Sequence, residues 1–178
     1  MNTLLSMETP RLLLRKFELA DARFLVQLMN DPDWLRFIGD RNMHSEEDAI
    51  THINEVPFPM YTEYGFGMLM VIRKDTLQTV GVAGILKRDF LEHPDIGYAF
   101  LPEGRGQGFA LEATQYLMET ATHQLEPCIV QAIVNPDNAA SIALLKKLGF
   151  EFIADQLESS AQPTHVYVYK SNSGEVIE

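Results

Sequence analysis

The sequence is poor in cysteine, because Cys128 is the only one among 178 residues. A single cysteine excludes a disulfide framework within the chain and suits a reducing compartment, so we expect a cytoplasmic protein. Nothing beside Cys128 in the sequence would activate its thiol. We therefore interpret it as a packing residue and not as a nucleophile.

Long apolar runs and metal-binding patterns are also missing. No stretch approaches the roughly 18 apolar residues that span a membrane, and the N-terminal segment lacks the basic and apolar regions of a signal peptide. The histidines show no metal-ligand spacing; they are His44, His52, His93, His123 and His165. These absences predict a chain without a membrane partner and without a metal.

Positive charge is scarce, since 14 Lys and Arg stand against 25 Asp and Glu, for a net charge of −11. This balance argues against nucleic acid as a direct partner. Acidic residues are dense between Asp31 and Glu63, which is compatible with attracting a cationic amine or a basic peptide. Solubility is the simpler reading of charge taken alone.

The pattern of apolar residues predicts a mixed α/β (α+β) domain in which helices cover a twisted sheet. We expect a single domain over residues 1–178, with a core at about 8–170 and a loose polar tail at 171–178. The expected strands cover 11–17, 67–72, 79–86, 96–101, 129–134, 150–155 and 165–169, and the expected helices cover 21–30, 45–56, 109–122 and 139–148. Hairpins are expected between the second and third strands and between the last two.

The most informative segment is a glycine-rich loop, Gly104-Arg-Gly-Gln-Gly-Phe-Ala110, between an expected strand and an expected helix. Unpaired N–H groups and the positive end of the helix dipole can hold a phosphate there. The loop lacks the Gly-Lys-Ser/Thr of a Walker A motif, and its glycine spacing does not fit a dinucleotide fingerprint. It predicts an anionic cofactor, and an ordinary glycine-rich turn is the alternative.

Three blocks of the sequence, taken together, resemble the GNAT superfamily of N-acetyltransferases, specifically its RimJ/RimL-type branch of ribosomal-protein N-terminal acetyltransferases. The blocks cover the chain from residue 8 to about residue 170. They are Glu8-Thr-Pro-Arg-Leu-Leu-Leu-Arg15 with Asp21-Ala22, Arg105-x-x-Gly108-x-Ala110, and Asn135…Asn138-x-x-Ser141 running into Leu148-Gly-Phe150. The resemblance implies a mostly antiparallel sheet of about seven strands, helices on both faces, and a splay between the fourth and fifth strands.

The resemblance also implies acetyl-CoA as the acetyl donor. The implied cofactor-binding residues are Phe100, Leu101, Arg105, Gly106, Gln107, Gly108, Phe109, Ala110, Asn135, Asn138 and Ser141. For three of them a plainer interpretation stays open. Arg105 could be solvated on its turn, Ser141 could satisfy local backbone, and Asn138 could simply cap its helix.

The catalytic residues implied by the resemblance are Tyr98, Ser141 and Asp95. Backbone amides near Tyr98 to Leu101 would polarise the thioester carbonyl. Many relatives place a tyrosine at the position of Leu145 to protonate the departing thiolate; the RimJ/RimL pattern has serine one turn earlier, at Ser141. Asp95 is the first candidate for the general base, and its neighbours Glu92 and His93 are further candidates. For each of the three, a solvated loop residue is the alternative.

We therefore predict a cytoplasmic N-acetyltransferase that moves an acetyl group to a primary amine by direct attack in a ternary complex. The acceptor would be a protein N-terminus or a small cationic amine, in a pocket shaped in this family by the segment of Trp34, Phe37, Met60 and Tyr61. The alternatives are a non-catalytic acyl-CoA-binding module and a nucleotide-binding α/β domain. A homodimer is compatible with the sequence, which does not fix the oligomeric state.

Overall fold

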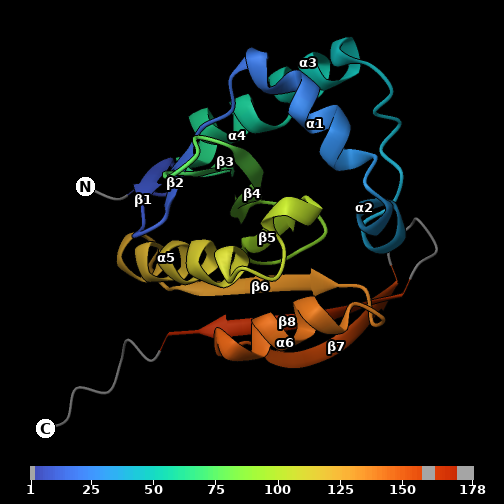
Figure 1. Ribbon diagram of the computed structural model, residues 1–178. Helices are drawn as coiled ribbons and strands as arrows, with labels where there is room; N and C mark the ends of the chain where they lie inside the picture. The colour runs from blue at the N-terminus through green and yellow to red at the C-terminus, as the bar shows by residue number, and fades with distance from the viewer. Residues whose placement is uncertain (1–2, 158–162, 172–178) are drawn as a thin grey trace, which may run out of the picture.

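The computed structural model describes residues 3–157 and 163–171 as a twisted sheet covered by helices on both faces (Figure 1). The sheet has eight strands in the order β1-β2-β3-β4-β5-β6-β8-β7. The strands are β1 (Ser6–Glu8), β2 (Leu12–Arg15), β3 (Met68–Arg73), β4 (Thr79–Leu86), β5 (Asp95–Phe100), β6 (Ile129–Val134), β7 (Glu151–Leu157) and β8 (Pro163–Lys170). The α-helices are α1 (Ala22–Met29), α2 (Pro32–Phe37), α3 (Glu46–Glu55), α4 (Pro57–Tyr64), α5 (Phe109–Gln124) and α6 (Ala139–Lys147).

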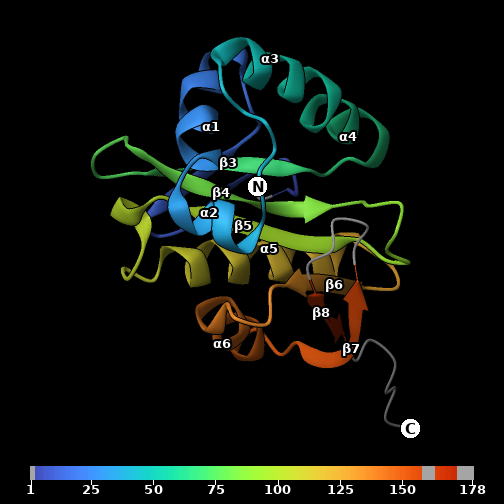
Figure 2. The same ribbon diagram turned by 90° about the vertical axis from the view of Figure 1, so that its right-hand side faces the viewer.

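The centre of the sheet is formed by β3 and β4, whose side chains are almost all buried. Helices α1, α3 and α4 lie over one face, and α5 and α6 lie over the other (Figures 1 and 2). Burial on both faces explains why these strands read as continuous apolar runs instead of alternating ones. The hairpins β3–β4 and β7–β8 are both antiparallel pairs, as predicted.

The sheet splits between β5 and β6, which are its parallel neighbours. The two strands share one register pair, Asp95 with Gln131, beside which the Gln131 amide donates to the Pro94 carbonyl at 2.8 Å. This confirms the splay expected between the fourth and fifth predicted strands.

Local sequence explains where two of the expected helices begin or end. Ser45 and Asp48 form a reciprocal capping box at the start of α3. Gly149 has φ 87° after α6, and the Phe150 amide donates back to the Leu145 carbonyl at 3.0 Å. A glycine in this left-handed conformation is the usual end of a helix.

The structure adds β1, α2 and α4 to the predicted elements. Pro32 follows the expected helix 21–30 and Pro57 follows the expected helix 45–56, and each occupies the first turn of a new helix. Proline is favoured there because its missing N–H needs no partner in the first turn. The additional strand β1 has only three residues, too few for a periodic pattern to show.

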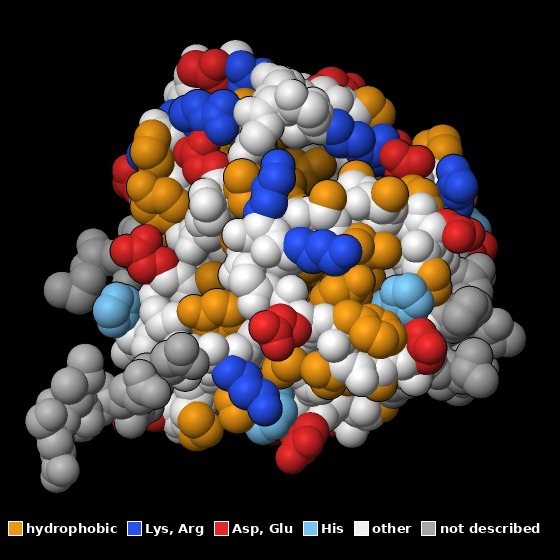
Figure 3. Space-filling model, turned by 90° about the horizontal axis from the view of Figure 1, so that it is seen from below, with side chains coloured by type: hydrophobic (Ala, Val, Ile, Leu, Met, Phe, Trp, Pro, Cys, Tyr) orange, Lys and Arg blue, Asp and Glu red, His pale blue; other side chains and the backbone are white. Residues whose placement is uncertain are grey.

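Charge of both signs is spread over the described surface. Figure 3 shows the face on the side of α6 and β7, where acidic, basic and hydrophobic side chains are interspersed. No helix among the described residues is long and apolar enough to cross a membrane. The single-domain organisation stays a prediction, and residues 172–178 of the predicted tail lie outside the described residues.

Candidate active site

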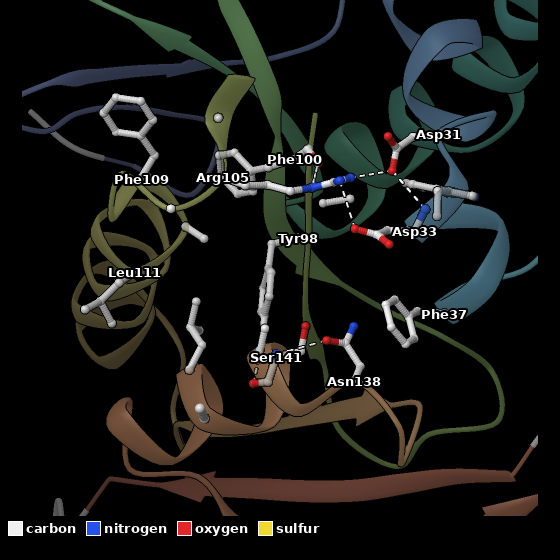
Figure 4. Close-up of a pocket in the computed structure, with 18 of the residues that line it drawn as sticks. Asp31, Asp33, Phe37, Tyr98, Phe100, Arg105, Phe109, Leu111, Asn138 and Ser141 are labelled. Atoms are coloured by element: carbon white, nitrogen blue, oxygen red, sulfur yellow. Dashed lines mark hydrogen bonds and ion pairs between the residues drawn. The ribbon is translucent and has the colours of Figure 1, made fainter. Parts of the chain in front are cut away.

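Two cavities meet where the sheet splits. The larger, of about 410 Å³, lies between the loop before α5, the end of β5, helix α2 and helix α6 (Figure 4). The smaller, of about 150 Å³, lies along the split between β5 and β6. Several residues line both cavities, among them Trp34, Phe37, Tyr98, Asn138 and Ser141. The two cavities therefore form one continuous candidate site.

The loop presents backbone N–H groups to the larger cavity. Gly106 and Gly108 have φ of 70° and 78°, a left-handed conformation that only glycine adopts at little cost. Gly108 caps α5, a helix of 16 residues, and the first helical bond is donated by Glu112 to the Gly108 carbonyl at 3.0 Å. The amides of residues 109–111 therefore have no acceptor within the helix and can bind an anion.

The loop is braced from β2 and its preceding turn. The Arg11 guanidinium donates to the Gln107 carbonyl at 2.9 Å and to the Glu112 carboxylate at 2.6 Å, and it lies 4.6 Å from the centre of the Phe109 ring. Burial raises the pKa of Glu112, but hydrogen bonds from Thr9 and Arg11 outweigh it, so that this pKa is lowered overall. Sequence reasoning missed this brace, because its residues are about a hundred positions apart.

The brace predicts a pH-dependent contribution of Glu112 to stability. A carboxyl with a lowered folded-state pKa stabilises the fold above its unfolded pKa, and this contribution is lost as the pH falls through the folded pKa. Glu112→Gln should reduce the free energy of unfolding by about 1 kcal/mol at pH 7, after allowing for solvent screening. Denaturant melts should show the difference shrinking toward acid pH. The exposed Glu119→Gln on the same helix is the control, and an equal loss there would refute a specific brace.

Helix α6 brings a capped N-terminus to the junction of the cavities. The Asn138 side chain accepts from the Ser141 amide at 3.1 Å and caps the helix. The Tyr98 hydroxyl reaches across from β5 and donates to the Ser141 carbonyl at 3.3 Å. Burial raises the pKa of Tyr98 to about 12, so its hydroxyl is protonated at neutral pH. Tyr98 and Ser141, each with a hydroxyl group, therefore meet at the junction of the two cavities.

The end of β5 leaves backbone amides directed at the split. The Leu101 amide donates to the Val80 carbonyl of β4 at 2.9 Å. Because N–H groups alternate between the two sides of an antiparallel strand, the amides of Tyr98 and Phe100 face β6, which pairs with β5 only at Asp95. The Phe100 carbonyl, on the same side, accepts from Arg105 Nε at 2.8 Å.

Comparison with known proteins identifies the family. The GNAT acetyltransferase domain matches residues 11–151. The chain belongs to the GNAT acetyltransferase family. A protein of Bacillus licheniformis described as "Uncharacterized N-acetyltransferase p20" is 30% identical over 168 residues, which is 90% of this chain and 92% of that protein. The protein is accordingly an N-acetyltransferase, and a nucleotide-binding domain with a coincidental loop is ruled out.

Solved structures share the GNAT fold at lower identity. An acetyltransferase from Agrobacterium tumefaciens superposes with a TM-score of 0.80 at 22% identity, over 96% of this chain and 97% of that one. RimL, described as a ribosomal L7/L12 alpha-N-protein acetyltransferase in complex with coenzyme A, gives a TM-score of 0.78 at 18% identity, over 93% and 97%. At these identities the likeness concerns the fold.

The GNAT fold brings most of the predicted site residues together. Phe100, Arg105, Gly106, Gly108, Phe109 and Ala110 line the larger cavity, Asn135 and Asp95 line the smaller, and Tyr98, Asn138 and Ser141 line both. Leu101 and Gln107 line neither cavity. The Leu101 amide is used by β4, and Gln107 is exposed with its carbonyl bound to Arg11. Any role of these two residues in cofactor binding stays a prediction.

Asp95 is the one of the three candidate bases that lines a cavity. Its carboxylate is 1% exposed, and Arg88 Nε lies 3.1 Å from each of its oxygens. Glu92 is exposed, and the His93 amide donates to the Gln131 side chain. The guanidinium offsets the cost of burying a charged carboxylate at this place.

Helix α2 forms the wall of the site opposite α6 (Figure 4). Trp34 and Phe37, which the resemblance placed in the acceptor segment, line both cavities. Tyr61 is instead a core residue that accepts from the Phe17 amide at 3.1 Å and donates to the Met68 carbonyl. Among the described residues no cluster of His, Cys, Asp or Glu could hold a metal.

Proposed function

We propose that this GNAT protein transfers the acetyl group of acetyl-CoA directly to a primary amine, either the N-terminal amine of a protein such as a ribosomal protein or a small cationic amine. The proposal rests mainly on one observation. The loop before α5 has backbone N–H groups without acceptors in the helix, and it lies beside the split between β5 and β6. Coenzyme A carries a pyrophosphate, which suits the amides of residues 109–111, and its thioester supplies an activated acyl carbon.

The extent of the larger cavity, from the loop to the split of the sheet, supports acetyl-CoA as the donor. The larger cavity begins at the loop and ends at Tyr98 and Ser141, so an extended arm held at its phosphate end by the loop would reach the split. A Cβ placed on Gly106 would meet nothing within 4 Å, which leaves the backbone open to a bound group. The amides of Tyr98 and Phe100 are then in place to polarise a carbonyl oxygen, as an oxyanion hole does.

The reaction requires a neutral amine, so a cationic amine must first lose a proton. The amine nitrogen bonds to the acyl carbon, the carbon–sulfur bond breaks, and one proton leaves the nitrogen while the thiolate gains one. Asp95 at the split is our candidate to accept the amine proton, directly or through water. No covalent intermediate on the protein is needed, because both reactants share one site.

Tyr98 and Ser141 are our candidates to stabilise the departing thiolate. A tyrosine with a pKa of about 12 would give its proton to a thiolate with a reference pKa near 8.5 only uphill, by roughly 5 kcal/mol. The two hydroxyl groups therefore act as hydrogen-bond donors, and the net proton reaches the sulfur from solvent. To do so, Tyr98 would turn its O–H from the Ser141 carbonyl, which accepts it at 3.3 Å, toward the sulfur. This arrangement takes the place of the tyrosine that many relatives carry at the position of Leu145.

The Ser141 hydroxyl should matter for turnover more than for binding. Ser141→Ala removes one hydrogen bond to the leaving sulfur, so kcat should fall about tenfold. The dissociation constant for acetyl-CoA, measured by calorimetry, should stay near its wild-type value because the loop is unaltered. An unchanged kcat would leave Ser141 with its role in the start of α6 only.

The acceptor class can be tested by assaying two sets of amines separately. N-terminal peptides and polyamines are each incubated with the protein and acetyl-CoA, and release of free thiol is followed. The proposal expects amine-dependent release in at least one set. Release with peptides alone would support the RimJ/RimL-type assignment, release with polyamines alone would support a small acceptor, and release with neither would contradict the proposed function.

A further inference from the structure

Helix α2 lines the site without being held by a buried apolar face. It has six residues, and none of them is fully buried. The Trp34 indole N–H is buried and has no hydrogen-bond partner among the described residues, which costs free energy in the docked position. Hydrophobic burial is therefore a weak explanation for the place of this helix, and other contacts have to hold it.

Arg105 supplies such contacts from the opposite side of the cavity. Its Nη2 donates to Asp31, its Nη1 lies 2.8 Å from Asp33, and its Nε donates to the Phe100 carbonyl at 2.8 Å. Asp31 precedes α2 and also caps it, accepting from the Asp33 amide at 3.0 Å. Figure 4 shows the Arg105 side chain extending from the loop across the top of the cavity to both carboxylates.

We infer that Arg105 is a positioning residue that fixes α2, and with it the wall carrying Trp34 and Phe37, to the end of β5. In the proposed function this wall bounds the pocket for the acceptor amine. The inference rests on the proposed function only for this assignment of the wall to the acceptor. The backbone of Arg105 remains part of the loop, while its guanidinium is committed to α2 and not to the phosphates of coenzyme A.

Charge and burial support this assignment over a phosphate contact. The Asp31 side chain is 5% exposed and Arg105 supplies its cation. Moving the guanidinium to a phosphate would leave this carboxylate buried without its partner, which is strongly unfavourable. The planar guanidinium also donates in fixed directions to three acceptors of the protein. A contact with a phosphate would require it to give up some of these bonds.

The single tryptophan makes the inference directly measurable, since Trp34 is the only one in the chain and lies on α2. Arg105→Gln and Asp31→Asn should each shift its emission to longer wavelength and increase acrylamide quenching in the ligand-free protein. Asparagine is as good a helix cap as aspartate, so Asp31→Asn removes the ion pair and keeps the cap. Arg105→Gln should give the larger shift, because it also breaks the ion pair with Asp33. The double variant should show the same shift as Arg105→Gln alone, because Asp31 acts through Arg105.

Two further variants complete the fluorescence experiment. Arg36→Gln removes a charge from α2 itself without touching the ion pairs, and it should leave the emission unchanged. Asp33→Asn breaks only the more exposed pair and should give a smaller shift in the same direction, which keeps the inference testable if Asp31→Asn fails to fold. Unchanged emission in both Arg105→Gln and Asp31→Asn would overturn the inference.

Binding and kinetics separate the inference from the proposed function. Arg105→Gln should leave acetyl-CoA affinity near wild type and lower kcat/KM for the acceptor about tenfold or more, through a misplaced wall. If Arg105 instead bound the phosphates, acetyl-CoA affinity would fall by about tenfold or more, and Asp31→Asn would not reproduce that loss. The fluorescence result needs neither ligand nor turnover, so it stands even if no amine is acetylated.

Discussion

Replacing Gly108 with glutamate should abolish measurable binding of acetyl-CoA, a loss of at least about a hundredfold. Gly108 caps α5 with φ 78°, so any other residue is strained there. A Cβ at this position would lie 3.4 Å from Arg11 Nη2, so a glutamate would disturb the Arg11 brace of the loop. Its negative charge would also lie close to the amides proposed to hold the pyrophosphate and would repel that group. Titration calorimetry with the folded variant measures the effect, and thermal unfolding checks the fold.

An uncharged substitution at the same position separates the two causes. Asparagine tolerates the left-handed conformation better than most residues, so Gly108→Asn should weaken binding far less than Gly108→Glu. Equal losses in both variants would assign the effect to the backbone. Wild-type affinity in folded Gly108→Glu would remove the loop from the donor site.

Asp95→Asn should lower kcat/KM by about a hundredfold, the usual contribution of a positioned general base. A base acts as the carboxylate, so wild-type activity falls as the pH drops and the base becomes protonated. In the variant this low-pH decline should disappear and leave a small residual rate. The pH profile of kcat/KM with a fixed amine gives the comparison, and acetyl-CoA affinity should be unaffected.

The control for Asp95 is its exposed neighbour. Glu92→Gln removes a carboxylate from the same segment, and it should leave the profile unaltered because the Glu92 side chain is 84% exposed. Asp95→Asn also leaves Arg88 without its carboxylate, so thermal unfolding must accompany the kinetics. A variant that folds and retains the wild-type pH profile would discard Asp95 as the base.

The sequence was sufficient for the features that local chemistry determines. Buried strands, the capping box at Ser45 and the end of α6 at Gly149 all follow from short-range patterns. The glycine loop was recognisable as well, although its positive φ values at Gly106 and Gly108 became evident only in the structure. A sequence pattern shows where glycine is present, but it does not show which backbone conformation requires glycine there.

The contacts that organise the site are long-range and escaped prediction. Arg105 and Asp31 are 74 residues apart in the chain, and Tyr98 and Ser141 are 43 apart. No local signal relates such pairs, because their proximity depends on how helices pack on the sheet. The acidic residues Asp31 and Asp33 illustrate the point: the charge pattern suggested attraction of a cationic acceptor, and the structure shows both bound to Arg105.

The most direct test of the account is a single-turnover reaction of the protein with acetyl-CoA and a reactive amine, followed by intact mass of protein and amine. Direct transfer predicts that the acetyl group appears on the amine with one free thiol per acetyl group, and that the protein stays unmodified whether or not the amine is present. Tight binding of acetyl-CoA with no acetylation of any amine, or an acetyl group accumulating on the protein itself, would contradict it.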